Sequence, residues 1–388
     1  MNPQPLYDLA PLLHIALLGA ILALGPLSWL WLRQRNADPA RRLHALTVLA
    51  LFLTFDLVLF GAFTRLTDSG LGCPDWPGCY GNASPFGARE HIDAAVQAMP
   101  YGPVNHAKAW IEMSHRYFAT AVGVLITVLA LASWRGARQG GGRISPWWAT
   151  ATLAWVILQG AFGALTVTMK LYPAIVTLHL LAGLVLLALL TVQSELRSNA
   201  TLGLGRRLRR GLAWVAGASF VQMALGGWVS TNYAVLACTE FPRCHGQWWP
   251  PMDFRAGFAL LRELGMGHGG AALSFEALTA IHYAHRLGAY VVLASMAWLA
   301  WRLQREGPAT QCWAAAVGAL AAWQLGTGLA NVLLGWPLAA AVAHTGGAAA
   351  WTVLLTLLLT RSRAARPVGA AAVAVRRSVY GSKVGPAS

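Results

Sequence analysis

Residues 174–193 read AIVTLHLLAGLVLLALLTVQ, a stretch without a single Asp, Glu, Lys or Arg. About 20 apolar residues are enough to cross the hydrocarbon core of a bilayer as a helix. The stretch is unbroken and lacks the alternation of a membrane-barrel strand, so we expect a helix. It decides the fold because runs of the same kind recur along the whole chain.

Apolar runs dominate the 388 residues, of which 56% are hydrophobic and only 11% charged. Roughly a quarter of the residues are charged in an average soluble domain. We therefore predict an all-α, polytopic membrane protein with nine transmembrane helices. The expected helices cover residues 12–32, 46–64, 109–134, 147–168, 174–193, 212–231, 277–301, 311–333 and 338–360.

The net charge of +15 raises the question of nucleic acid, but the distribution of the 29 Lys and Arg residues argues against it. Counted over alternate loops, 20 of them lie on one side of the membrane and seven on the other. By the positive-inside rule, the side richer in basic residues is cytoplasmic. We expect a protein of the cell inner membrane with its N-terminus outside, its C-terminus in the cytoplasm and no nucleic-acid partner.

An internal repeat organises the chain. GAFTRLTDSGLGCPDWPGCYG from Gly61 aligns with GGWVSTNYAVLACTEFPRCHG from Gly226, at an offset of 165 residues. The offset is 170 residues at the His115-Arg116 motif and is again 165 from Gln159 onward. The aligned pairs are Cys73 with Cys238, Cys79 with Cys244, His115 with His285, Arg116 with Arg286, Gln159 with Gln324, and His179 with His344.

The repeat predicts two parallel, pseudo-symmetric four-helix bundles, residues 46–195 and 212–360, because an even number of crossings returns each copy to the same orientation. Residues 1–45 then form an extra N-terminal transmembrane helix and a cytoplasmic loop. The first apolar run is too long for a cleavable signal peptide, so this helix is expected to stay. Residues 196–211 are expected to be a basic cytoplasmic linker, and residues 361–388 a disordered cytoplasmic tail.

Four histidines repeat within the predicted helices: His115 and His179 in the first half, His285 and His344 in the second. His115 and His179 are each about six residues from the outer end of their helix, about 9 Å deep at 1.5 Å per residue. Ionisable residues inside the membrane are functional candidates, and two imidazoles facing each other in a bundle can hold a heme iron. Structural hydrogen bonds or a proton relay are the alternative; zinc is disfavoured because further ligands are missing.

Arginines follow two of these histidines, at Arg116 and Arg286, where a guanidinium can pair with heme propionates or extend to lipid headgroups. Glu112 lies one turn before His115, and its counterpart in the repeat is His282. Positions three apart share a helix face, so we expect the Glu112 carboxyl to point toward the first heme site. A carboxylate in one half only suggests chemistry there; a pairing with Lys108 or Arg116 is the alternative.

The cysteine pairs Cys73/Cys79 and Cys238/Cys244 lie in the two long outer loops, on the oxidising side, where disulfides are favoured. The spacing leaves open whether such a bridge is structural or redox-active, and metal delivery is a weaker third option.

Together, these motifs resemble the heme A synthase family of cytochrome oxidase assembly. The similarity covers residues 50–360 and rests on TRLTDSGLGCPDWPGC, the Glu112-x-x-His115-Arg116 motif, QGAFGALTV, His179 in LHLLAG, CTEFPRCHG, His285-Arg286 and His344. It implies an oxidoreductase that converts the C8 methyl of heme O to a formyl group by successive hydroxylations, giving heme A. The extra first helix is a departure from the eight-helix core of the family.

The resemblance also implies roles for individual residues. His115 and His179 would bind the substrate heme O, His285 and His344 a heme b cofactor, and Glu112 would be catalytic. It implies a disulfide between Cys73 and Cys79. Heme O synthase and an electron acceptor in the membrane are the expected partners. The sequence leaves open whether the protein forms a homo-oligomer.

Two other classes of protein share part of this pattern. A di-heme b-type electron carrier without substrate chemistry accounts for the four histidines but not for the difference between Glu112 and His282. A secondary transporter accounts for the repeat. Its site would lie at the midplane, whereas the histidines lie near one face.

Overall fold

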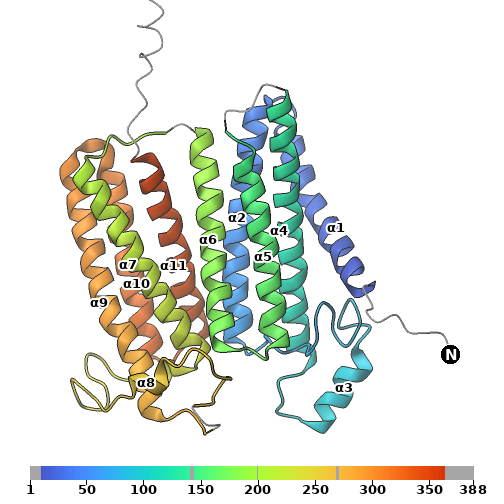
Figure 1. Ribbon diagram of the computed structural model, residues 1–388, viewed down its shortest axis with the longest axis vertical. Helices are drawn as coiled ribbons and strands as arrows, with labels where there is room; N and C mark the ends of the chain where they lie inside the picture. Colours follow the sequence, from blue (N-terminus) through green and yellow to red (C-terminus); the bar gives the residue numbers. More distant parts are fainter. Residues whose placement is uncertain (1–9, 140–143, 199, 268–270, 363–388) are drawn as a thin grey trace, which may run out of the picture.

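The computed structural model describes residues 10–139, 144–198, 200–267 and 271–362. These residues form long parallel or antiparallel helices, with short helices in loops at one end and no β-strand (Figure 1). The long helices are α1 (Ala10–Arg33), α2 (Pro39–Leu66), α4 (His106–Arg138), α5 (Trp147–Thr168), α6 (Pro173–Ser198), α7 (Arg206–Thr231), α9 (Phe275–Glu306), α10 (Pro308–Leu333) and α11 (Leu338–Arg361). The short ones are α3 (Arg89–Ala98), η1 (Ala234–Ala237) and α8 (Phe254–Gly257).

Eight of the long helices in the described part of the chain are long and apolar enough to cross a membrane, which makes this a polytopic all-α membrane protein. The prediction was nine. The exception is α9, whose apolar stretch is shortened by His285 and Arg286 on one side and by Arg302 on the other. Nevertheless, α9 is 32 residues long and stands in the bundle between α7 and α10.

The first half is a ring of four helices in which α2 packs on α4, α4 on α5, α5 on α6 and α6 back on α2. Helices α4 and α6 are therefore diagonal to each other. Apolar side chains from all four helices fill the ring at the end away from the loops, among them Leu46, Leu125, Ala149 and Leu190. Helix α1 lies outside the ring, against α4.

The second half repeats this arrangement: α7 packs on α9, α9 on α10, α10 on α11 and α11 on α7. Here α9 and α11 are the diagonal pair, in the places of α4 and α6. The core of this half is again apolar, with Leu212, Leu299, Val317 and Trp351 buried between the helices.

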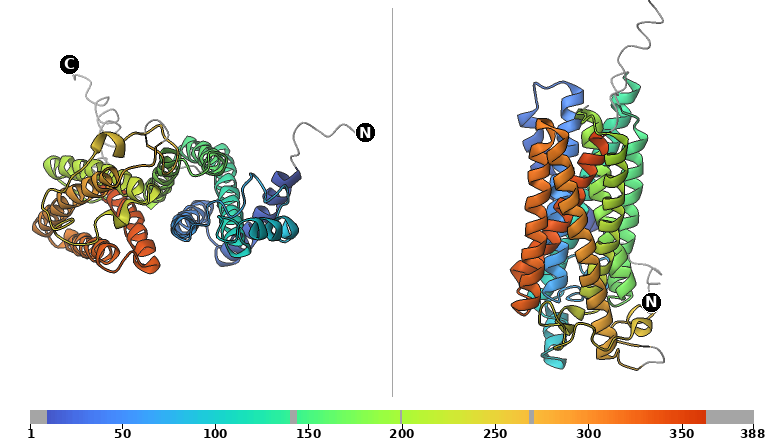
Figure 2. Two further views of the ribbon diagram at one scale, coloured as in Figure 1. Left: turned by 90° about the horizontal axis from the view of Figure 1, so that it is seen from below. Right: turned by 90° about the vertical axis from the view of Figure 1, so that its left-hand side faces the viewer.

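The two halves stand next to each other along a seam formed by α2 and α6 on one side and α7 and α11 on the other (Figure 2). At the loop end, Arg65 donates to the backbone oxygen of Ser230 at 2.7 Å, and the Tyr233 hydroxyl donates to Asp68 at 2.6 Å. At the opposite end, the guanidinium of Arg361 is ion-paired with Glu195. Apolar side chains also pack along the seam, among them Leu184, Leu187 and Ala349.

The loop end carries structure that the apolar pattern does not predict. Helices α3, η1 and α8 lie in the two long loops, 67–105 and 232–274, which follow α2 and α7. Polar N-caps begin the long helices that leave these loops: Asn105 accepts from the Lys108 amide and Ser274 from the Ala277 amide. At the other end, α7 already begins at Arg206 and α11 continues to Arg361. The predicted linker and tail are thus partly helical, while residues 363–388 of the predicted tail lie outside the described residues.

Candidate functional site

The four repeated histidines lie on the diagonal helices of their halves: His115 on α4 and His179 on α6, His285 on α9 and His344 on α11. Each half thus carries one of its two repeated histidines on each of the two opposite helices of its ring.

A glycine stands against each imidazole, and the glycines repeat with the histidines. A Cβ atom added at Gly61 on α2 would lie 3.1 Å from Nε2 of His115, and one at Gly226 on α7 would lie 2.9 Å from Cε1 of His285. Gly163 on α5 and Gly328 on α10 stand in the same way at 3.4 Å from Cε1 of His179 and His344. The glycines thus let each imidazole lie close to the backbone of the neighbouring helix, where a Cβ atom would contact the ring.

Side chains of neighbouring helices contact the second pair of imidazoles. The Gln222 amide on α7 lies 3.0 Å from Nδ1 of His285, and the Thr327 hydroxyl on α10 lies 2.9 Å from Nδ1 of His344. Neither residue was predicted from the sequence, because the aligned segment begins at Gly226 and the repeat pairs Gln324 without including Thr327. The signal was present: Gln222 lies one turn before Gly226 on the same helix face, and Thr327 lies next to Gly328.

Both cysteine pairs form disulfides, Cys73 with Cys79 and Cys238 with Cys244. The loop closed by the first disulfide folds back on itself, since the Cys79 and Asn82 backbones exchange hydrogen bonds and Asp75 accepts from the Tyr80 and Gly81 amides. The second loop repeats this pattern with Cys244, Gln247 and Glu240. The disulfides expected from the sequence are thus in place.

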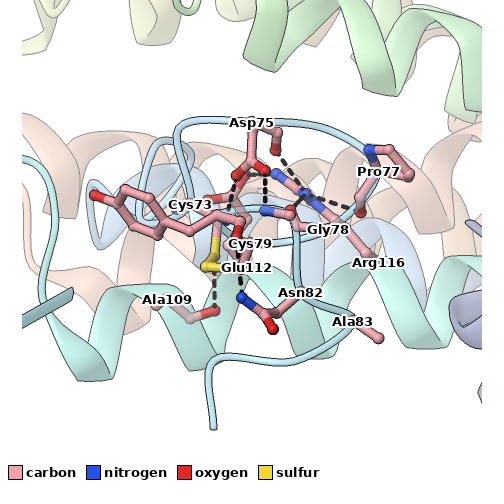
Figure 3. Close-up of a disulfide and its surroundings, with 12 residues drawn as sticks. Cys73, Asp75, Pro77, Gly78, Cys79, Asn82, Ala83, Ala109, Glu112 and Arg116 are labelled. Carbon is pink, nitrogen blue, oxygen red and sulfur yellow. Dashed lines mark hydrogen bonds and ion pairs between the residues drawn. A yellow bond between two sulfur atoms is a disulfide. The ribbon is translucent and has the colours of Figure 1, made fainter. Parts of the chain in front are cut away.

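The arginines that follow His115 and His285 hold these loops. The Arg116 guanidinium donates to the backbone oxygens of Asp75, Pro77 and Gly78, at 2.6–3.1 Å (Figure 3). Arg286 does the same in the second half, with the oxygens of Cys238, Glu240 and Arg243 at 2.7–3.0 Å. The contacts that the structure gives these groups are therefore with the disulfide loops, and propionate binding stays a prediction.

Glu112 is buried, with 4% of its surface exposed, and binds both Arg116 and the loop. One carboxylate oxygen accepts from Arg116 at 2.6 Å and the other from the backbone amide of Cys73 at 2.8 Å (Figure 3). His282 occupies the same place in the second half, where its Nε2 lies 3.0 Å from Nε of Arg286. The pairing with Arg116, the alternative considered for Glu112, is thus present.

The residues fit a heme in each half. Two imidazoles on opposite helices of a bundle are donors that would suit heme iron, and the four glycines keep larger side chains away from both rings. Three of the buried side-chain atoms without a hydrogen-bond partner within the described residues lie at these sites: Nδ1 of His179, Oε1 of Gln159 and Oε1 of Gln222.

Comparison with known families identifies the family of the chain. Residues 44–359, from the start of the first ring to the end of the last helix, match the COX15-CtaA family model, described as cytochrome oxidase assembly protein. The chain belongs to this family. The match includes both disulfide loops and all four repeated histidines, and leaves α1 outside.

Curated relatives in the same family carry the name heme A synthase. The protein of Shewanella oneidensis is 35% identical over 314 residues, which cover 80% of this chain and 93% of its own length. The protein of Bradyrhizobium sp. strain BTAi1 is 29% identical over 88% of this chain and 96% of its own length. That of Chelativorans sp. is 31% identical over 75% and 82%, respectively.

Proposed function

We propose that this protein is a membrane oxidoreductase that acts on heme O and converts its C8 methyl group to a formyl group by successive hydroxylations, giving heme A for cytochrome oxidase. The family match and the names of the relatives support this activity. The structural observation that carries it is the pair of imidazoles on diagonal helices, each against a glycine, in both halves.

The two halves have different roles in this proposal. His115 and His179 bind the substrate, heme O, and His285 and His344 bind heme b as a resident cofactor. The carboxylate of Glu112 supports this division, because His282 replaces it in the second half. Bound heme supplies an iron that can accept and pass on electrons.

The protein's own side chains position the substrate and manage protons. Glu112 is three residues before His115 and is held at both oxygens, by Arg116 and by the Cys73 amide. A carboxylate fixed in this way is a suitable proton acceptor beside the methyl group to be oxidised, either directly or through a water. The disulfide loop and Arg116 set its position.

We further propose nine membrane-spanning helices and two pseudo-symmetric halves. Helix α9 is included because it packs between α7 and α10 as α4 packs between α2 and α5. The loop end faces the outside of the inner membrane, since the opposite side holds 20 of the 29 basic residues. Heme O synthase as the source of the substrate and a membrane electron acceptor are the proposed partners.

Co-expression with a heme O synthase, in a host without its own heme A, tests the activity. Extracted hemes are separated by chromatography and identified by mass. We expect heme A, or its hydroxylated precursor, with the wild type, and heme O alone with His115→Ala or His179→Ala. If the wild type leaves heme O untouched with an intact acceptor chain while keeping two unmodified hemes, the protein is a di-heme electron carrier instead.

A further inference from the structure

A cavity of about 500 Å³ lies in the seam between the two halves, at the end of the long helices away from the disulfide loops. It is lined by residues of α6, α7 and α11, which pack against one another there (Figure 1). Sites for small molecules usually measure roughly 300–1,000 Å³. The cavity is therefore large enough to hold a ligand.

Three arginines on one face of α7 line this cavity: Arg206, Arg209 and Arg210. They lie three and four residues apart, and such positions are neighbours on a helix surface. All three are exposed, and their side chains form no hydrogen bond or ion pair with any described residue. None of the residues that line the cavity is acidic. The lining thus leaves three positive charges without a counter-charge.

The buried carboxylate at this end of the seam is already paired. Arg361 binds both oxygens of Glu195, so this carboxylate does not balance the arginines of the cavity. The backbone oxygen of Arg361 also accepts from the Leu202 amide at 2.7 Å, which ties the segment before α7 to the end of α11. No described side chain caps α7 at Gly205, and the free amides of a first helical turn add to the positive potential.

The internal repeat shows that this charge is not common to both halves. At the offset of 165 residues, Arg209 and Arg210 correspond to His44 and Ala45. The positive-inside rule accounts for basic residues on one side of a membrane, but it does not select one face of one helix. The position of the arginines around the cavity therefore calls for an anionic ligand as well.

Apolar and hydroxyl side chains continue the cavity beyond the arginines. Ala213 lies seven residues after Arg206, which is about 10 Å along α7 at 1.5 Å per residue. On α11, Leu359 lies between Thr356 and Thr360, and all three line the cavity. A free phosphate ion makes no use of the apolar part. A lipid uses both parts, because it has an anionic head group and apolar chains.

We propose that this cavity binds the head group of an anionic phospholipid of the phosphatidylglycerol class, through Arg206, Arg209 and Arg210. Guanidinium groups bind phosphate oxygens through paired, charge-assisted hydrogen bonds. Basic pockets between membrane helices are suited to anionic head groups. The bound lipid contacts α6 of the first half and α7 and α11 of the second, so it bridges the seam. The inference needs only helices that cross a membrane and is independent of the proposed heme chemistry.

Lipid titration of the full-length protein in detergent tests the site. Bound lipid is counted by native mass spectrometry while phosphatidylglycerol, or phosphatidylcholine with the same acyl chains, is added. We expect one phosphatidylglycerol to bind more tightly than further copies and more tightly than phosphatidylcholine. Arg209→Gln should weaken this first binding step about fivefold, and Arg209→Gln with Arg210→Gln roughly 25-fold, as expected for one and two arginines beside an anionic lipid. Equal affinity for the two lipids would overturn the proposal.

Arg207 provides a matched control for general attraction between a basic surface and anionic lipid. It is exposed and lies on the same turn of α7, but it does not line the cavity. We expect Arg207→Gln to leave the affinity for the first phosphatidylglycerol unchanged. Equal losses in Arg207→Gln and Arg209→Gln would show that the surface charge acts without a site, and the proposal would be wrong.

Ala213→Phe tests the cavity itself, because it fills the space and keeps all three arginines. Ala213 is exposed, so the larger ring replaces no packed side chain. We expect the tight binding of the first phosphatidylglycerol to be lost, while the unfolding temperature without added lipid stays as in the wild type. Unchanged lipid binding in this variant would place the lipid elsewhere on the protein.

Two further measurements identify the source of the anion and test the bridge. A large excess of inorganic phosphate should not displace the first phosphatidylglycerol, and displacement would identify the cavity as a site for free phosphate instead. Phosphatidylglycerol should raise the unfolding temperature of the wild type more than that of the variant with Arg209→Gln and Arg210→Gln. Equal rises in the two proteins would contradict the bridging of the seam.

Discussion

Glu112 and Cys73 are joined by a hydrogen bond of 2.8 Å between the carboxylate and the backbone amide. The candidate catalytic residue is thereby fastened to the disulfide that closes the loop above it. Arg116 completes the connection, because the same guanidinium binds Glu112 and three carbonyl oxygens of that loop. Substitutions here act on chemistry and on loop structure, and the experiments have to separate the two.

Glu112→His tests the carboxylate without removing the contact to Arg116, since the second half uses His282 in that place. We expect the variant to fold and to bind heme, but to accumulate heme O, with heme A formation lowered by at least about 100-fold for loss of a proton-transfer group. Extracted hemes are measured by chromatography. Glu90→Ala, in the exposed α3 helix of the same loop, is the control and should leave heme A formation unchanged.

Arg116→Ala removes the cation that neutralises buried Glu112 and the donor to three carbonyls. Breaking a buried ion pair by removing one partner costs about 3 kcal/mol or more, so we expect a clearly lower unfolding temperature in detergent. Hydrogen exchange should increase over residues 73–82. Arg89→Ala, whose side chain is 74% exposed, should leave both measurements as in the wild type. Unchanged exchange in Arg116→Ala would refute the holding role.

The two disulfides should differ in their effect on activity. Each closes a loop of similar size, and the chain-entropy model gives about 2 kcal/mol of stability for such a closure. Of the two disulfides, the first has a cysteine whose backbone amide donates a hydrogen bond to a buried carboxylate, from Cys73 to Glu112. Replacing Cys73 and Cys79 by Ser should therefore lower the rate of heme A formation more than replacing Cys238 and Cys244, at equal heme b content. Equal rates in the two double variants would show that the Glu112 contact does not depend on the disulfide.

The ion pair between Glu195 and Arg361 should stabilise the seam at the end away from the loops. Glu195 is 7% exposed at its side chain, and Arg361 also lies over the Trp313 ring at 5.0 Å. We expect Glu195→Gln to cost about 3 kcal/mol and Arg361→Ala more, because the ring contact is lost as well. A double-mutant cycle measures the coupling. The exposed pair Arg302 and Glu306 should show a coupling of at most about 0.5 kcal/mol.

The sequence predicted the helical architecture because membrane crossing imposes a length and a composition. Every predicted run lies within a long helix. What it did not predict is structure set by polar contacts in water: α3, η1 and α8 lie in loops where no apolar run marks a helix. Helix α9 is the opposite case, since its candidate site residues His285 and Arg286 weaken the apolar signal that identifies a span.

The site was predicted in its residues more than in its contacts. The repeat identified the histidines, arginines and cysteines, since aligned positions need no knowledge of geometry. It could not show that Arg116 turns toward backbone oxygens of the loop. Every residue has a backbone carbonyl, so the sequence does not indicate which of them accepts a hydrogen bond. The same holds for the Cys73 amide that binds Glu112. Gln222 and Thr327 were not predicted because they differ between the copies, and a repeat identifies only the residues that the copies share.

The polar contacts at the loop end of the seam have an evolutionary consequence. Arg65 meets Ser230, and Asp68 meets Tyr233, and in both cases the partners are 165 residues apart. Each residue thus contacts its own counterpart in the other copy. Contacts of this kind occur at the two-fold axis of an isologous homodimer. A single four-helix ancestor could have paired with itself through this surface before duplication and fusion. Once joined in one chain, the copies no longer had to be identical, which is consistent with Glu112 in one copy and His282 in the other.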